Sequence, residues 1–183
     1  MLKNIFPTKI EVIENFLNKE EIDDLYSHVK KLSYIDHSVI NGDGKSTFTP
    51  HDSNCLEGNK LEKKINNEIE KYCISIGIEK STIDLCWANI QKKDSFLKMH
   101  HHHYSPVAGA LYVKTDDKSS RLCFQNPNTY SLITNYVADP NPNVICYNVN
   151  PGDLFLFPGW LHHGSNYELN KSEERIVLSF NCK

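Results

Sequence analysis

Histidines gathered in two short runs are the residues of this sequence best suited to chemistry. Residues 100–103 are four consecutive histidines, and His162 and His163 form a second run later in the chain. Together the two runs hold six of the nine histidines. Because neutral imidazole is the commonest metal ligand among side chains, this clustering predicts a metal centre built between two segments of the chain.

The spacing within the first run selects which histidines can share an ion. Successive side chains of an extended strand point to opposite faces, so His100 and His102 can face one side while His101 and His103 face the other. A third ligand can come from the second run, where His162 and His163 both qualify. Three protein ligands with open positions are typical of a catalytic metal site, whereas structural sites are closed. The alternative is a solvated histidine loop that binds ions adventitiously.

The elements that must position these histidines are mostly β-strands. Short apolar runs bounded by turn residues predict strands over 10–16, 83–91, 107–115, 121–125, 144–149, 153–158 and 175–182. Two amphipathic helices are expected before the strand-rich half, one capped by Asn18 with Glu21 and one by Asn59 with Glu62, the second ending at Gly77. Helices followed by many short strands favour a sandwich or barrel of jelly-roll type with helices packed outside.

The segment 33–58 is polar and rich in turn residues. A loop of this length in a compact domain is often functional or mobile, so a lid over a substrate pocket and a plain surface excursion both remain open. Its two histidines, His37 and His51, stand alone, and we expect them to be solvated and outside the site.

Bulk composition limits the partners and the environment. With 183 residues the chain fits one domain, 1–183, and its net charge of −3 and pI near 6.3 argue against nucleic acid or an anionic membrane surface as partner. No window approaches the length of an apolar membrane span. The six cysteines are scattered without a CxxC pair, so we expect buried free thiols in a soluble, cytoplasmic protein.

Several motifs, in this order along the chain, resemble one enzyme superfamily. They are an FPTKI segment near the N-terminus, Trp87-x-Asn89, an HxH before AGALYV, PGDLFLFPGWLHH, and Arg175 followed by SFN. From Phe6 to Asn181 the chain resembles the 2-oxoglutarate- and iron(II)-dependent oxygenases, in particular their small phage and bacterial prolyl-hydroxylase-like branch. The resemblance implies a double-stranded β-helix, that is, a cupin-like jelly-roll core flanked by two main α-helices.

The resemblance also assigns roles to individual residues. His100 and His102 take the first two iron-ligand positions, and the spacing of FPGWLHH favours His163 over His162 as the distal ligand. Arg175, twelve residues after His163, takes the place of the basic residue that grips the 5-carboxylate of 2-oxoglutarate, a task suited to its planar fork. By strand parity Ser179 and Asn181 share the face of Arg175, and the resemblance adds Tyr112, Asn89 and Ser179 as cosubstrate contacts.

The implied activity uses iron(II), 2-oxoglutarate and O2, and hydroxylates an unidentified small molecule or protein side chain with release of succinate and CO2. One feature departs from the superfamily pattern, because His102 stands where a carboxylate is usual and makes the site one unit more positive. Two alternatives therefore remain: a three-histidine cupin-type metalloenzyme in which Arg175 binds substrate instead of 2-oxoglutarate, and a non-catalytic jelly-roll binding module.

Overall fold

The structure is a computed structural model that describes residues 7–50, 53–128 and 143–183. Three features considered in the sequence lie wholly or mostly outside these residues: Phe6, His51 and the loop expected over 126–143.

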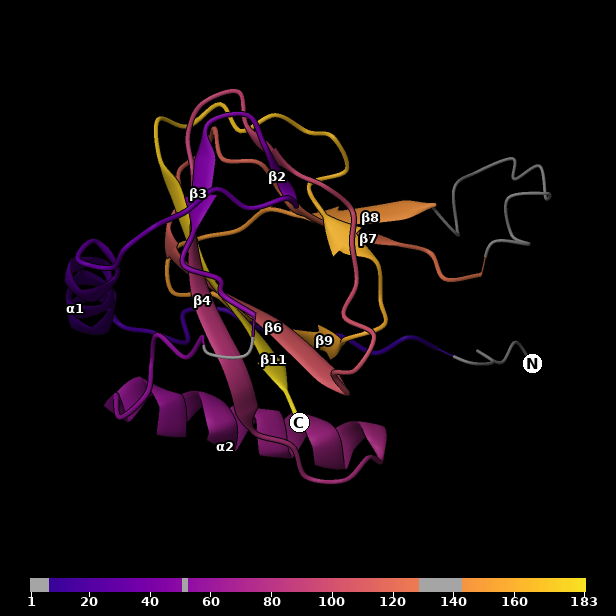
Figure 1. Cartoon of the computed structure of the whole chain (residues 1–183). Helices are drawn as coiled ribbons and strands as arrows, with labels where there is room; N and C mark the ends of the chain where they lie inside the picture. The colour runs from indigo at the N-terminus through magenta and orange to yellow at the C-terminus, as the bar shows by residue number, and fades with distance from the viewer. Residues whose placement is uncertain (1–6, 51–52, 129–142) are drawn as a thin grey trace.

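Two antiparallel sheets form the framework (Figure 1). The larger has six strands in the order β1 (Glu11–Ile13), β9 (Leu154–Pro158), β6 (Val107–Lys114), β11 (Arg175–Cys182), β4 (Ile83–Gln91) and β3 (Gly44–Ser46). The smaller has the order β10 (His163–Gly164), β7 (Leu122–Gln125) and β8 (Val144–Tyr147). A two-stranded pair, β2 (Ile40–Asn41) with β5 (Phe96–Leu97), completes the strands of the described residues.

Two helices precede most of the strands, as the sequence predicts. In α1 (Lys19–Val29) the Asn18 side chain accepts from Glu21 N–H and the Glu21 carboxylate accepts from Asn18 N–H, which confirms the capping box. Asn59 caps α2 (Lys60–Ile76), but the second capping box is wrong, because the Glu62 carboxylate accepts from Asn54 Nδ2 instead. Neither of these described helices has the length and apolar character needed to cross a membrane.

Strand alternation divides the apolar residues into two cores. On β6, Val107, Leu111 and Val113 point toward the helices, whereas Ala108, Ala110 and Tyr112 point into the space between the two sheets. Strands β9 and β11 follow the same alternation. In Figure 1, α1 and α2 lie on one side of the large sheet and β7 and β8 on the other. The mostly β fold with flanking helices is therefore confirmed, and the inner face of the large sheet is the one available for a site.

The segment 33–58 is not a plain surface excursion, because parts of it belong to the sheets. Its β3 pairs with β4 and extends the large sheet, and its β2 pairs with β5. The strands β2, β3, β5 and β10 have only two or three residues each, and partners distant in sequence define them.

The expectation that all six cysteines are free thiols is wrong for two of them. Cys123 on β7 and Cys146 on β8 lie opposite each other in register and form a disulfide. The other four, Cys55, Cys73, Cys86 and Cys182, are free.

Candidate active site

Two segments distant in sequence bring the histidines together. His100 and His163 form an antiparallel bridge in which each backbone N–H donates to the other's carbonyl oxygen at 2.9 Å. His102 N–H donates to the Gly159 carbonyl at 2.8 Å. A Cβ at Gly159 would collide with the carbonyl oxygens of Ser105 and His102, so only glycine permits this close approach. The PGW turn is thus fitted against the histidine run.

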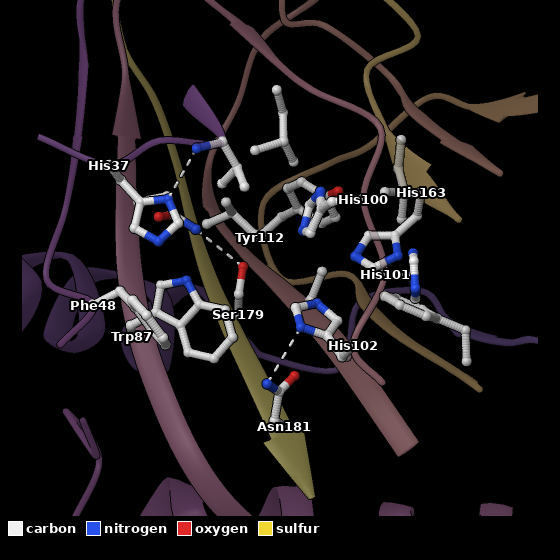
Figure 2. A pocket seen from close by; sticks show the side chains of 18 of the residues that line it. His37, Phe48, Trp87, His100, His101, His102, Tyr112, His163, Ser179 and Asn181 are labelled. Atoms are coloured by element: carbon white, nitrogen blue, oxygen red, sulfur yellow. Dashed lines mark hydrogen bonds between the residues drawn. The ribbon is translucent and has the colours of Figure 1, made fainter. Parts of the chain in front are cut away.

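His100, His102 and His163 form the three-residue group that can hold a metal ion within the described part of the chain. Each offers one ring nitrogen, and these three nitrogens all lie within 4.8 Å of one another. Figure 2 shows the three rings gathered on one side of a pocket. His162 lies outside this group, with its ring nitrogens facing His101 and Gln125. The structure therefore brings His163 rather than His162 to the cluster.

Hydrogen bonds orient the rings of His100 and His163 so that the same nitrogen of each remains open. Nδ1 of His100 lies 2.8 Å from the Lys98 carbonyl oxygen, and Nδ1 of His163 lies 2.8 Å from the Leu161 carbonyl oxygen. Each carbonyl requires an N–H at Nδ1, which leaves the Nε2 lone pair free. This arrangement, in which a partner holds the non-ligating nitrogen, is common at metal-binding histidines. Nδ1 of His102 is 3.3 Å from the side-chain amide of Asn181.

Burial keeps the three imidazoles neutral. Desolvation is the main cause that lowers the pKa of His100 and, to about 3, the pKa of His102. Burial also holds the pKa of His163 well below its usual value, and repulsion from His100 and His102 adds to the shift. Neutral rings have the lone pairs that a cation needs, so the donor set fits a metal at neutral pH.

Arg175 enters the same pocket as a buried cation, 2% exposed. Its guanidinium donates to Gln91 Oε1 at 2.5 Å, to Tyr112 OH at 3.4 Å and, through Nε, to the Ser120 carbonyl at 3.1 Å. No carboxylate of the described residues forms an ion pair with it. A buried charge without a counter-ion is costly, so the pocket is suited to an anionic ligand.

Polar groups around Arg175 add to this suitability. Gln91 Nε2 and Ser120 Oγ are buried and have no hydrogen-bond partner within the described part of the chain. Burial raises the pKa of Tyr112 although Arg175 opposes the shift, so the hydroxyl stays protonated and can donate to a carboxylate. Tyr112 lines the pocket together with Arg175, whereas Gln91 and Ser120 contact the guanidinium but are not among the lining residues.

The pocket has a volume of about 300 Å³ and contains all the residues that the sequence singles out. Those residues are His100, His102, His163, Arg175, Tyr112, Asn89, Ser179 and Asn181. Asn89 Nδ2 donates to Ser179 Oγ at 3.1 Å, while Asn89 Oδ1 and Asn181 Oδ1 have no hydrogen-bond partner among the described residues. Strand parity grouped Arg175, Ser179 and Asn181 on one face of β11, and all three line this pocket. Asn89 on β4 was expected from the family resemblance alone.

Sequence reasoning missed an aromatic row in the same pocket. His37, Phe48 and Trp87 contact one another edge to face, with ring centroids 5.1 and 5.0 Å apart. In Figure 2 they lie on the side of the pocket away from His100 and His163. The sequence could have placed Trp87 in the pocket, because on β4 it lies on the same face as Asn89. It could not have placed His37 and Phe48 there, because they belong to the irregular segment 33–58. The expectation that His37 is solvated and outside the site is wrong.

A family comparison matches this geometry. The model for the 2OG-Fe(II) oxygenases matches residues 85–181, more than half of the chain. The chain belongs to the 2OG-Fe(II) oxygenase family. This oxygenase therefore uses iron(II), 2-oxoglutarate and O2, as the sequence predicts. No curated protein sequence gives a significant match.

Solved structures share the fold of the oxygenase at low sequence identity. HygX from Streptomyces hygroscopicus, solved with nickel, 2-oxoglutarate and hygromycin B, has a TM-score of 0.65 at 14% identity, covering 96% of this chain and 82% of its own. A 2OG-Fe(II) oxygenase-family oxidoreductase from Burkholderia pseudomallei has a TM-score of 0.70 at 10% identity, covering 95% and 85%. The viral collagen prolyl hydroxylase of Paramecium bursaria Chlorella virus-1, in its 2-oxoglutarate complex, has a TM-score of 0.58 at 15% identity, covering 94% and 94%. The double-stranded β-helix expected from the motifs is confirmed.

Proposed function

We propose that the oxygenase is a hydroxylase in which His100, His102 and His163 hold iron(II) and Arg175 binds the far carboxylate of 2-oxoglutarate. One observation carries this assignment: one pocket holds three neutral imidazoles, that of His163 buried and the other two half-buried, and a buried guanidinium with no ion pair to a described residue. When bound, the iron and the cosubstrate supply oxygen activation, with succinate and CO2 as by-products. The residues of the chain provide orientation and exclude water.

Each proposed contact has a physical task. Arg175 offers a charge-assisted hydrogen bond, and the protonated Tyr112 hydroxyl offers a second donor beside it. Asn89 and Ser179, hydrogen-bonded to each other, line the pocket as further cosubstrate contacts. The row of His37, Phe48 and Trp87 provides an aromatic wall for the primary substrate, which we take to be a small molecule or a protein side chain.

The whole chain, residues 1–183, is proposed to be one domain in the cytoplasm. The packing supports the single domain, because the core on one face of the large sheet includes residues of both helices and the other face of that sheet carries the pocket. Cytosolic disulfides are rare, so a cytoplasmic location requires that Cys123 and Cys146 remain reduced in the cell.

An anaerobic titration tests the proposed ligands. Iron(II) and then 2-oxoglutarate are added to the protein, and a visible metal-to-ligand charge-transfer band is expected. His163→Ala should abolish the band by removing a ligand. Arg175→Leu should raise the Kd of 2-oxoglutarate by about 10- to 100-fold, the worth of one hydrogen bond to a charged group.

Arg121→Leu is the matched control, since Arg121 is the other arginine and pairs with Glu168 at the surface. It should leave the Kd of 2-oxoglutarate unchanged. Iron(II) affinity, measured on each variant, shows whether the fold survives. If Arg175→Leu binds iron and also binds 2-oxoglutarate like the parent protein, Arg175 is not the carboxylate partner. If iron binds without a band, the three-histidine site does not use 2-oxoglutarate.

A further inference from the structure

The histidine run carries a second cluster on its other side. His101 and His103 alternate with His100 and His102 along the run, and His162 is exposed next to the buried His163. His101 also lines the edge of the pocket. The ring of His101 lies between the other two, with centroids 4.1 Å from His103 and 4.4 Å from His162. His103 and His162 are exposed. None of these three belongs to the group proposed to hold iron.

The ring nitrogens of this outer cluster face one another in a fixed order. Nδ1 of His162 lies 3.3 Å from Gln125 Oε1, which accepts only an N–H. Nε2 of His162 is therefore an acceptor, and it lies 2.5 Å from Nδ1 of His101. That contact places the single proton of His101 on Nδ1. The Nε2 lone pair of His101 is left facing His103, 2.9 Å from its Nε2.

We infer that His101 and His103 form a second metal site, a surface chelate for a divalent transition cation such as Ni²⁺ or Cu²⁺. Two nitrogens bound at about 2.05 Å and at a right angle are about 2.9 Å apart, which is the separation of these two Nε2 atoms. Right angles between neighbouring ligands are characteristic of square-planar and octahedral ions, and nitrogen ligands favour Cu²⁺ and Ni²⁺. Water fills the remaining positions at this exposed site.

His162 and Gln125 position the chelate without binding the ion. The His101 Nδ1–H donates to His162, and the His162 Nδ1–H donates to Gln125, so the chain of hydrogen bonds fixes the tautomer and the orientation of His101. A partner on the non-ligating nitrogen strengthens a histidine ligand and is worth about 10- to 100-fold in metal affinity. The outer site uses two protein nitrogens and should bind more weakly than the inner group of three.

Calorimetric titration with Ni²⁺ alone, without 2-oxoglutarate, tests the outer site. The parent protein should bind two equivalents. His101→Asn/His103→Asn should bind one, and His163→Ala should keep the outer equivalent. Gln125→Leu should weaken that equivalent severalfold without removing it. Tyr104→Ala, an exposed change beside the run, is the control and should bind two equivalents.

Electron paramagnetic resonance of Cu²⁺ added to His163→Ala gives a second readout, because coupling to two nitrogens should be lost in His163→Ala/His101→Asn. A parent protein that binds one equivalent, with none left in His163→Ala, would overturn the outer site. One equivalent that survives His163→Ala and disappears in His101→Asn/His103→Asn would support the outer site and count against the inner one.

Discussion

At the residue scale, His102 differs from the other proposed ligands in what holds its ring. His100 and His163 use backbone carbonyls, whereas Nδ1 of His102 faces the side-chain amide of Asn181. If Nε2 binds a metal, Nδ1 must carry the proton and needs an acceptor. Oδ1 of Asn181 has no hydrogen-bond partner in residues 7–50, 53–128 and 143–183, and turning the amide by half a rotation presents that oxygen to His102. Asn181 is thus a positioning residue for the histidine that replaces the usual carboxylate.

Asn181→Leu should lower iron(II) affinity by about 10- to 100-fold, since it removes the partner of a metal-binding histidine. Asn181→Asp should keep or raise that affinity, because a carboxylate accepts the same hydrogen bond and offsets a positive charge. Competition with a coloured chelator measures the affinity. Ser179→Ala, a change on the same face of β11, should bind iron like the parent protein. Equal affinity in Asn181→Leu would show that the amide does not position His102.

How well single residues could be predicted depended on periodicity. Parity on regular strands grouped Arg175, Ser179 and Asn181, and the same rule places Gln91 on the face of Asn89. His37 and Phe48 could not be predicted, because their segment has no periodic pattern. Contacts between segments distant in sequence brought them to the pocket. Which histidine of the second run turns inward was predicted from a motif and not from physics.

At the scale of secondary-structure elements, the carboxylate of Glu174, just before β11, connects the ends of three other elements. Glu174 forms ion pairs with Lys30 after α1, Lys92 after β4 and Lys114 at the end of β6, at 2.8 to 3.1 Å. Burial by itself raises the pKa of Glu174, but the hydrogen bonds from these lysines outweigh it and lower the pKa to about 2. The next residue is Arg175, so this network fixes the start of the strand that carries the proposed carboxylate partner.

The network predicts a pH dependence of stability. Because the pKa of Glu174 is lower in the folded state than in the unfolded chain, its contribution is complete above about pH 5 and disappears as the pH falls toward 2. Glu174→Gln should lower the free energy of unfolding at pH 7 by about 1 to 2 kcal/mol, a value reduced for the partly exposed lysines. Urea unfolding at several pH values measures it.

Below pH 5 the stability of Glu174→Gln should fall less steeply than that of the parent protein. Glu173→Gln changes the exposed neighbouring carboxylate and serves as the control, which should follow the parent curve. Parallel curves for Glu174→Gln and the parent protein between pH 5 and 2 would contradict the role of the network.

The elements themselves were predictable in proportion to their length. The strands over 83–91 and 175–182 match β4 and β11, because long apolar alternation is a property of the local sequence. Strands such as β3 and β10 exist only because a partner lies beside them. The Glu62 capping box failed for a related reason, since Asn54, outside the helix, takes the carboxylate.

At the scale of the whole molecule, the Cys123–Cys146 disulfide makes the small sheet sensitive to the redox conditions around the protein. The pair joins β7 to β8, and β7 in turn pairs with β10, where Phe124 lies opposite His163. Scattered cysteines in the sequence gave no sign of this pairing, because register between β7 and β8 sets it. The strand that presents a proposed iron ligand therefore rests on a redox-sensitive neighbour.

Reduction of this disulfide should lower the stability of the whole molecule. A crosslink between residues separated by 23 positions is worth about 3 kcal/mol through the entropy of the unfolded chain, or about 6 to 12 °C in Tm for a protein of this size. Thermal unfolding with and without a reductant measures the difference. Cys123→Ala/Cys146→Ala should unfold at the same Tm in both conditions.

Thiol titration of the denatured protein should find four thiols before reduction and six after it. Six thiols before reduction, with a Tm that reductant leaves unchanged, would contradict the disulfide and favour a protein that works in a reducing cytoplasm.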